Sequence, residues 1–395
     1  MRAGETLDDA RRAMNVCNAC RYCEGFCAVF PALELRREFG PGDLSYLANL
    51  CHNCRACYYA CQYAPPHEFG INLPRTLAEL RAESYAQHSW PRGLAVLFRR
   101  NGLAVSLAAA LGSAVVLALT MLLRAPERLY SASAAPGAFY ALIPAEAMLA
   151  VAGITFGFSL LALAVGTVKF WRAMGADGSG GGLPRARPIL HARPWLQARA
   201  LLQARALLQA LGDALTLRYL GGHDGGAGCN DRDERFSQTR RRLHHALFYG
   251  FLLCFASTCV AALYEHVLGR LAPYPLLSPP VLLGALGGAG MMIGAGGLVW
   301  LKVVGDPVPA APGMLGADFA LLFLLLLTAA TGLLLLALRE TGAMGVLLAV
   351  HLGCVLAFFL AMPYSRFVHG PYRLAALLRH ALERPAEERA PGAGA

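Results

Sequence analysis

The chain has 395 residues, of which 56% are hydrophobic and only 15% are charged. This composition excludes a protein that is soluble throughout its length and predicts that most of the chain lies in lipid. The net charge of +10 does not indicate nucleic acid, because membrane topology and anionic lipid account for it and no basic DNA-reading motif is present.

Two runs of four cysteines lie near the N-terminus, and both have the spacing C-x2-C-x2-C-x3-C. They consist of Cys17, Cys20, Cys23 and Cys27, and of Cys51, Cys54, Cys57 and Cys61. Bacterial two-cluster ferredoxins have this ligand run, and in them the fourth cysteine of one run ligates the cluster of the other. The spacing therefore predicts two [4Fe-4S] clusters held by these thiolates, and with them electron transfer.

Disulfides and zinc are the alternatives for these cysteines. Disulfides form in oxidising compartments, and residues 1–30 contain no apolar segment that could export the runs. Zinc is the stronger rival because C-x2-C pairs build four-thiolate sites, but four ligands within eleven residues favour a larger, multi-atom cluster. The proline that usually follows the fourth cysteine is displaced to Pro31 and Pro65, which leaves the ligand pattern intact.

The cysteine runs belong to a compact, mostly helical module predicted at residues 1–90. It is small for a core of its own, so metal binding would supply much of its folding free energy. Six uncharged runs of about twenty residues follow, each long enough to cross the hydrocarbon core. They lie near 103–123, 147–168, 246–264, 281–301, 319–338 and 344–362. Glycines in the fourth run would let helices or a flat ligand approach closely.

Arginine and lysine concentrate in the connection 169–243, which the positive-inside rule places in the cytoplasm. Its repeated QARALL sequence, at 197–202 and 203–208, predicts a helix that lies on the membrane or a partner, or is simply solvated. The glycine-rich loop around His223 and Cys229 has no predicted ligand role. With six spans, both termini are then cytoplasmic, and the bacterial inner (cytoplasmic) membrane is the predicted location.

Histidines at the edges of the spans predict a second kind of redox centre, because ionisable residues at membrane depth are costly and usually functional. His244 and His245 open the third span and His266 closes it, whereas His351 lies early in the sixth span and His369 just past it. The last two are eighteen residues apart, five whole turns, and would share one face of a straight helix.

The third span runs outward and the sixth inward, so His244 or His245 would share the cytoplasmic level with His369. His266 would share the outer level with His351. Facing imidazoles at one level are what bis-histidine haem b requires, so one or two haems are predicted, with His245, His351 and His369 among the iron ligands. Interfacial histidines also cap helices or meet headgroups.

Other residues near the sixth span bear on this prediction. Pro363 should end or kink the span before His369. Nearby arginines could pair with haem propionates, although the positive-inside pattern already explains them; they are Arg241, Arg242, Arg366 and Arg373.

The predicted fold class is all-α, with an N-terminal helical ferredoxin-like two-[4Fe-4S] domain followed by a six-helix transmembrane bundle of cytochrome b type. The predicted domains are the cytoplasmic cluster module at 1–90, two spans within 91–168, the basic connection at 169–243, four spans with haem ligands within 244–370, and a cytoplasmic tail at 371–395.

Several segments resemble the tricarballylate utilisation protein B family, also called CitB, to which the C-terminal part of the cobalamin-pathway protein CobZ is similar. Besides the doubled cysteine runs, they are PPHEFGINLPR, RRRLHHALFYGFLLCFAST, APYPLLSPPVLLGALGGAG, LRETGAMGVLLAVHLG and PYSRFVHGPYR. The resemblance implies a membrane subunit with iron-sulfur clusters and b-type haem. It would reoxidise the flavin of a separate tricarballylate dehydrogenase, so that tricarballylate goes on to cis-aconitate. Where the family often pairs histidines, this chain has Tyr264-Glu265-His266.

The chain has no G-x-G-x-x-G between a strand and a helix, so the flavin is expected in an FAD-dependent dehydrogenase partner. Electrons would pass from that flavin through both clusters and haem to a membrane quinone, with Tyr364, Tyr274 and Glu265 as candidate proton groups. No catalytic residue is predicted in this chain.

Three alternative functions remain open on the sequence alone. One is a heterodisulfide-reductase-like oxidoreductase, which would need more cysteine-rich motifs than the isolated Cys229, Cys254, Cys259 and Cys354. Another is electron transfer from quinol to a soluble acceptor, which uses the same parts. The third is a redox-silent membrane protein with structural zinc.

Overall fold

The computed structural model describes residues 3–124, 126–130, 132, 135–175, 193–221 and 228–383. Throughout these residues the regular structure is helical, apart from one isolated antiparallel bridge between Cys229 and Ser237. The predicted all-α class is thus confirmed. Residues 176–192 and 222–227 of the basic connection lie outside the described residues, as does the end of the tail after residue 383.

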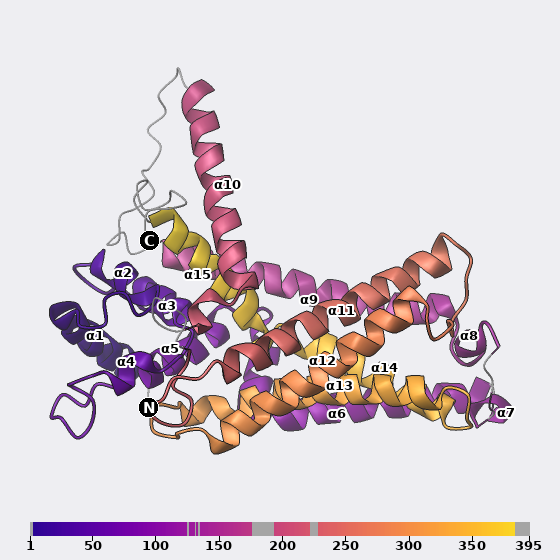
Figure 1. Ribbon diagram of the computed structural model, residues 1–395. Helices are drawn as coiled ribbons and strands as arrows, with labels where there is room; N and C mark the ends of the chain where they lie inside the picture. Colours follow the sequence, from indigo (N-terminus) through magenta and orange to yellow (C-terminus); the bar gives the residue numbers. More distant parts are fainter. Residues whose placement is uncertain are drawn as a thin grey trace.

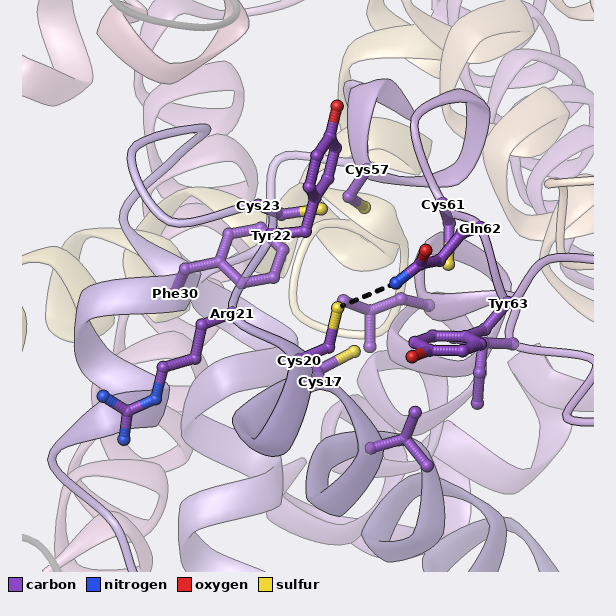
Figure 2. Close-up of a pocket in the computed structure, with 13 residues that line it drawn as sticks. Cys17, Cys20, Arg21, Tyr22, Cys23, Phe30, Cys57, Cys61, Gln62 and Tyr63 are labelled. Carbon is purple, nitrogen blue, oxygen red and sulfur yellow. Dashed lines mark hydrogen bonds between the residues drawn. The ribbon is translucent and has the colours of Figure 1, made fainter.

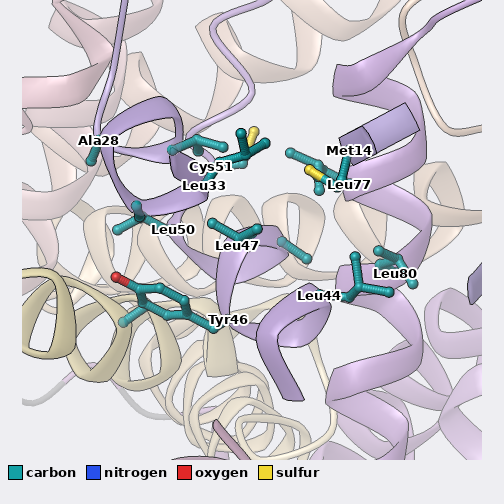
Figure 3. Packing of buried hydrophobic residues seen from close by; sticks show 14 of the residues in the cluster. Met14, Ala28, Leu33, Leu44, Tyr46, Leu47, Leu50, Cys51, Leu77 and Leu80 are labelled. Atoms are coloured by element: carbon teal, nitrogen blue, oxygen red, sulfur yellow. The ribbon is translucent and has the colours of Figure 1, made fainter. Parts of the chain in front are cut away.

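The first five helices form a small helical unit, residues 3–88, called the N-terminal unit below. They are α1 (Ala3–Cys20), α2 (Val29–Glu34), α3 (Pro41–Leu50), α4 (Ala56–Tyr59) and α5 (Leu73–His88). Met14, Leu44, Leu47 and Leu77 are almost fully buried where α1, α3 and α5 meet (Figure 3). Proline at the start of α3 suits a helical first turn.

Six long helices extend away from the N-terminal unit and lie side by side (Figure 1). They are α6 (Arg92–Arg124), α9 (Ala145–Met174), α11 (Thr239–His266), α12 (Pro279–Val304), α13 (Pro312–Leu338) and α14 (Met344–Ala361). Each is long and apolar enough to cross a membrane, and each contains one of the predicted spans. Leu123, Ile154 and Leu286 on their outer surfaces are mostly exposed, as expected of side chains that face lipid.

The bundle has two distinct ends. The N-terminal unit covers the proximal end, where α6 and α11 begin and α9 and α14 end. The distal end carries the short helices α7 (Pro126–Leu129) and α8 (Ala138–Leu142). Helix α10 (Arg193–Leu215) contains both QARALL repeats, as predicted, and projects from the proximal end (Figure 1).

Helices α11 and α12 touch backbone to backbone through glycine. A Cβ atom added at Gly287 would lie 2.7 Å from the Gly250 carbonyl oxygen, and one added at Gly294 would lie 2.4 Å from the backbone nitrogen of Leu247. Such short distances leave no room for any side chain. The glycines of the fourth span therefore serve close helix packing, one of the two uses predicted for them.

The sixth span ends earlier than the histidine spacing assumed. Helix α14 stops at Ala361, two residues before Pro363, and the 3-10 turn η2 (Arg366–Val368) leads into α15 (His369–Glu383). Proline disfavours helical backbone in the residue before it and offers no N–H of its own. His351 and His369 thus lie on different helices, and the prediction that they share one helical face is wrong.

Helix α15 packs into the N-terminal unit rather than into the bundle. Its residues Tyr372, Ala376 and Leu377 are buried in the same cluster as Leu44 and Leu47. Phe170, from the proximal end of α9, stacks on Tyr372 with a centroid distance of 4.9 Å. Segments from both ends of the chain therefore build one core at the proximal end.

A buried ion network fixes the end of α15 to α3 and to the segment between α2 and α3. Arg36 Nη2 lies 2.9 Å from Glu383 Oε1, and Arg36 Nε lies 2.7 Å from Asp43 Oδ1. Arg379 and the Tyr46 hydroxyl also bind Glu383, at 2.7 Å and 3.1 Å. The Arg36 side chain has no exposed surface, so each of these pairs satisfies a charge that water cannot reach.

Candidate functional site

The eight cysteines of the two runs gather around two neighbouring cavities in the N-terminal unit. Cys17, Cys20, Cys23 and Cys61 line the first cavity, shown in Figure 2. Cys27, Cys51 and Cys54 line the second cavity. Cys57 lies on the wall between the two.

Electrostatic interactions assign Cys57 to the second group. Burial, then the Cys54, Cys51 and Cys27 thiols, raises the pKa of Cys57 well above its usual value. Below, the first nest is Cys17, Cys20, Cys23 and Cys61, and the second nest is Cys27, Cys51, Cys54 and Cys57. Each nest takes three cysteines from one run and the fourth cysteine of the other, the exchange found in two-cluster ferredoxins.

The donor set fits a multi-atom cluster better than a single ion. Within the described ranges, no three His, Cys, Asp or Glu side chains converge closely enough to hold one metal ion. The thiols instead surround two adjoining cavities. Burial, followed by the Cys61, Cys23 and Cys20 thiols, raises the pKa of Cys17 to about 12, and cationic iron would reverse that effect by favouring thiolate.

Local backbone shape turns the cysteine loops around the cavities. Helix α1 ends at Cys20, and Arg21, Asn53 and Arg55 take positive φ angles of 53°, 57° and 69°. The Asn53 N–H donates to Cys51 Sγ at 3.3 Å, and Gln62 Nε2 approaches Cys20 Sγ at 3.7 Å (Figure 2). Hydrogen bonds to cluster sulfur are a main means of tuning reduction potential.

The second nest is tied directly to the bundle. The carbonyl of Cys54 accepts the N–H of Asn230 at 2.9 Å, and the carbonyl of Asn53 accepts from Arg240 of α11 at 2.6 Å. The Cys51 carbonyl accepts from both Arg81 of α5 and Arg373 of α15, each at 2.9 Å. The first nest lies at the outer side, where Tyr22 beside its cavity is 66% exposed.

His244 and His369 face each other at the proximal end, with ring centroids 6.0 Å apart and ring planes at 81°. The structure therefore places His244, rather than His245, opposite His369. A haem placed between these two rings would be held by the two imidazoles and would supply one-electron transfer.

The two rings differ in their hydrogen bonding. His369 Nδ1 lies 2.6 Å from the Arg366 carbonyl, so Nδ1–H donates and Nε2 remains for a ligand, the usual arrangement of ligating histidines. His244 Nδ1 is buried without a hydrogen-bond partner among the described atoms. Burial, then Arg373 and His244, lowers the pKa of His369 well below its usual value, which keeps the ring in the neutral form that binds metal.

The predicted outer pair is not brought together. His351 lies within hydrogen-bond distance of Thr331 Oγ1 of α13, at 3.1 Å, and its ring packs against Gly332. His266 is exposed at the last residue of α11. His351 is seven residues into α14, about 10 Å along the axis, so it lies deeper than the helix end that carries His266.

The other predicted polar residues have protein partners. Tyr364 donates to the Trp90 carbonyl at 3.2 Å, Tyr274 donates to the Ala261 carbonyl at 3.0 Å, and Glu265 accepts from Tyr140 at 2.6 Å. Among the arginines suggested for propionates, Arg241 binds the Thr216 carbonyl at 2.9 Å. The quinone groups remain predictions from the sequence.

Sequence reasoning missed two residues beside the second nest. His52 lines its cavity, and Nδ1 of His52 lies 2.8 Å from the Leu50 carbonyl. In the sequence, the position of His52 directly after Cys51 could have indicated its place beside the second nest. Cys229, read as part of a flexible loop, is completely buried in a cluster with Cys54. No local sequence signal indicates that contact, because it joins residues 175 positions apart.

Fold and site together define a class: a helical protein with six apolar helices that fit a multi-pass membrane protein and a ferredoxin-like unit at one end. Two family models match, the Citrate utilization protein B Fer4-like domain at residues 10–87 and Citrate utilization protein B at residues 96–392. The chain belongs to the citrate utilization protein B family, as the sequence resemblance predicted.

One curated relative extends this match over the whole chain. The Citrate utilization protein B of Escherichia coli is 45% identical over 387 residues, which cover 98% of this chain and 95% of the relative. No solved structure matches the chain. The Fer4-like domain supports iron-sulfur binding in the N-terminal unit.

Proposed function

We propose that this protein is the membrane electron-transfer subunit of a citrate or tricarballylate utilisation system. It reoxidises the reduced flavin of a separate FAD-dependent dehydrogenase of the tricarballylate type. It passes the electrons through two [4Fe-4S] clusters and haem b to the quinone pool. The family name and its Fer4-like domain support the general role, and the geometry of the proximal end supports the details.

The order of the ligand groups is the observation that carries the proposal. The first nest is outermost, the second nest adjoins the bundle, and the His244–His369 pair lies at the start of the spans. Arg373 holds the Cys51 carbonyl and is one helical turn after His369 on α15. Electron transfer through a protein requires redox centres with short distances from each centre to the next.

Each ligand group has an assigned role in the proposal. The eight cysteines hold the two clusters, which supply one-electron transfer when bound. His244 and His369 hold one haem, and the Arg366 carbonyl orients the His369 ring. A second haem on His266 and His351 has no comparable support. Cys254 of α11 and Cys354 of α14 both pack in the apolar interior of the bundle, the packing role expected of isolated buried cysteines.

The proposed location is the bacterial inner membrane with the proximal end in the cytoplasm. Basic residues cluster at this end of the bundle; they include Lys169, Arg172, Arg240, Arg241, Arg242, Lys302 and Arg366. The distal loops carry few, among them Arg128 and Arg270. Positive residues in short loops mark the cytoplasmic side.

The cofactors are tested by electron paramagnetic resonance, iron counting and pyridine haemochrome analysis of the purified protein. About eight cluster irons per chain and one haem are expected, and a colourless protein with bound zinc would overturn the proposal.

His369→Ala and His244→Ala should remove the haem spectrum and keep the cluster signals, because they remove axial ligands. His245→Ala should keep both. If His245→Ala loses haem while His244→Ala retains it, the ligand assignment is wrong.

The direction of flow needs a separate measurement on the intact protein in vesicles. Chemically reduced tricarballylate dehydrogenase should reduce the haem, and a soluble quinone should then reoxidise it, both followed by haem absorbance. Haem reduction by quinol but not by the reduced flavoprotein would assign the opposite direction, from quinol to a soluble acceptor.

A further inference from the structure

Arg81 is a buried cation with unsatisfied donors. It lies in the middle of α5 and is 1% exposed. Its Nη1 donates to the Cys51 carbonyl at 2.9 Å, but Nε and Nη2 are buried and have no hydrogen-bond partner among the described atoms. A buried guanidinium with two unpartnered nitrogen donors is costly unless a ligand accepts hydrogen bonds from them. The Tyr85 hydroxyl, one turn further along α5, is buried and unpartnered as well.

The charges around Arg81 are mostly positive. Burial, followed by the neighbouring Arg81 and Arg366 guanidinium groups, lowers the pKa of Arg373 to about 9. Arg366 is paired with Asp318 at 3.2 Å, but Asp318 also binds Lys302 at 2.5 Å. The Asp318 carboxylate thus interacts with Arg366, Lys302 and Arg81 together, and the Cys51 thiol is a second acidic group, which acts on Arg81 and Arg373. Two acidic groups therefore meet four cations here, and a further anion would reduce the excess of positive charge.

This positive group adjoins the histidine pair. Arg366 supplies the carbonyl that holds His369 Nδ1 at 2.6 Å. Arg373 follows His369 by one turn of α15, and its charge acts on the His369 ring. An anion bound by Arg81, Arg366 and Arg373 therefore lies beside whatever His244 and His369 bind.

We infer that Arg81, Arg366 and Arg373 form the receptor for the propionate carboxylates of the haem held by His244 and His369. This inference rests on the proposed function. The planar fork of arginine matches a carboxylate with two parallel hydrogen bonds. A lipid phosphate is a poorer candidate, because Arg81 lies inside the contact between the N-terminal unit and the bundle. Arg81 and Arg373 would then each bridge the Cys51 carbonyl and the haem. In each guanidinium group, one nitrogen donates to the Cys51 carbonyl and the others face the propionates.

The inference is tested by measuring the haem midpoint potential, which does not depend on the activity of the protein. A nearby positive charge favours ferrous over ferric haem, so Arg81→Gln should lower the potential. At the wild-type midpoint we expect the ferric-to-ferrous ratio to rise about tenfold, equivalent to about 59 mV for one electron. Arg75→Gln is the matched control. Arg75 is on the same helix, its side chain is 45% exposed, and its ion-pair partner is Glu79. The haem potential of the Arg75→Gln variant should match that of the wild type.

Because Arg81 also holds the Cys51 loop, cluster signals are recorded for every variant. If Arg81→Gln loses them, Arg366→Gln decides alone, since the Arg366 side chain contacts Asp318 and Met314 rather than the Cys51 loop. It should shift the potential in the same direction. Unchanged potentials in both variants would overturn the inference. So would a wild-type potential that varies with added phosphate, which would assign the arginines to an exchangeable anion. Absence of haem from the wild type would instead overturn the proposed function.

Discussion

Cys61 and Cys57 are four residues apart in one run but line different nests. Cys61 shares the first cavity with Cys17, whereas Cys57 is grouped electrostatically with Cys27. The exchange follows from chain reversal between α1 and α4, which brings the end of each run to the start of the other. The function of a cysteine is therefore set by its place in the fold rather than by its nearest neighbours in sequence.

This exchange predicts which substitutions are equivalent. Cys17→Ala and Cys61→Ala should leave the same residual electron paramagnetic resonance spectrum, because each removes a ligand of the first nest. Cys27→Ala and Cys57→Ala should share a different one. Each variant serves as the control for the others. If the Cys61→Ala spectrum matches that of Cys57→Ala instead, ligands are not exchanged between the runs.

The sequence allowed the cysteines to be recognised from spacing alone, but it left the histidine choice open. His244 and His245 are about 100° apart around α11, so only the rotation of the packed helix decides which ring meets His369. Arg81 gave no signal at all. An arginine in an amphipathic helix is ordinarily solvated, and its burial becomes visible only when α5, α13 and α15 are assembled.

At the scale of elements, the contact between α11 and α12 depends on glycine. Gly287→Ala places a methyl group 2.7 Å from two backbone atoms of α11, and backbone cannot move aside as a side chain can. Overpacking of this kind costs about 1–3 kcal/mol, so we expect a lower melting temperature in detergent. Gly296→Ala is the control on the same helix, because its added Cβ meets nothing within 4 Å. Equal melting temperatures would contradict backbone contact.

Apolar runs predicted how many helices are long enough to cross a membrane, but not where these helices end. The run near 103–123 lies in a helix that begins at Arg92, and the run near 147–168 lies in one that continues to Met174. An uncharged run of residues indicates only the part of a helix that lies in the hydrocarbon core. The helix itself continues beyond that run into polar sequence. Those extensions carry the contacts with the N-terminal unit, such as Phe170 on Tyr372.

At the scale of the whole molecule, one carboxylate joins the two ends of the described chain. Glu383→Gln breaks the pairs with Arg36 and Arg379 and leaves a buried guanidinium short of a partner. Loss of one member of a buried ion pair costs about 3–5 kcal/mol. We expect a lower melting temperature and faster proteolysis of α15. Glu340→Gln is the control, since the Glu340 side chain is 67% exposed at the distal end. Similar melting of both variants would show that the network does not hold α15.

The division into a cysteine-rich unit and a bundle followed from composition, but the role of α15 did not. Its sequence reads as a basic amphipathic tail, and its partners Leu44 and Leu47 are more than 300 residues away. Contacts of that separation leave no local pattern. The placement of His369 depends on them, which is why the straight-helix argument from His351 failed.

Because α15 completes the core of the N-terminal unit, biosynthesis has a fixed order. The segment with both cysteine runs leaves the ribosome first, yet Tyr372 and Leu377, which close its interior, are made after all six spans. Closure of the unit is therefore postponed until translation has passed the last span. Until α15 is made, the Cys51 carbonyl therefore lacks its Arg373 donor and the unit lacks the side chains that complete its interior.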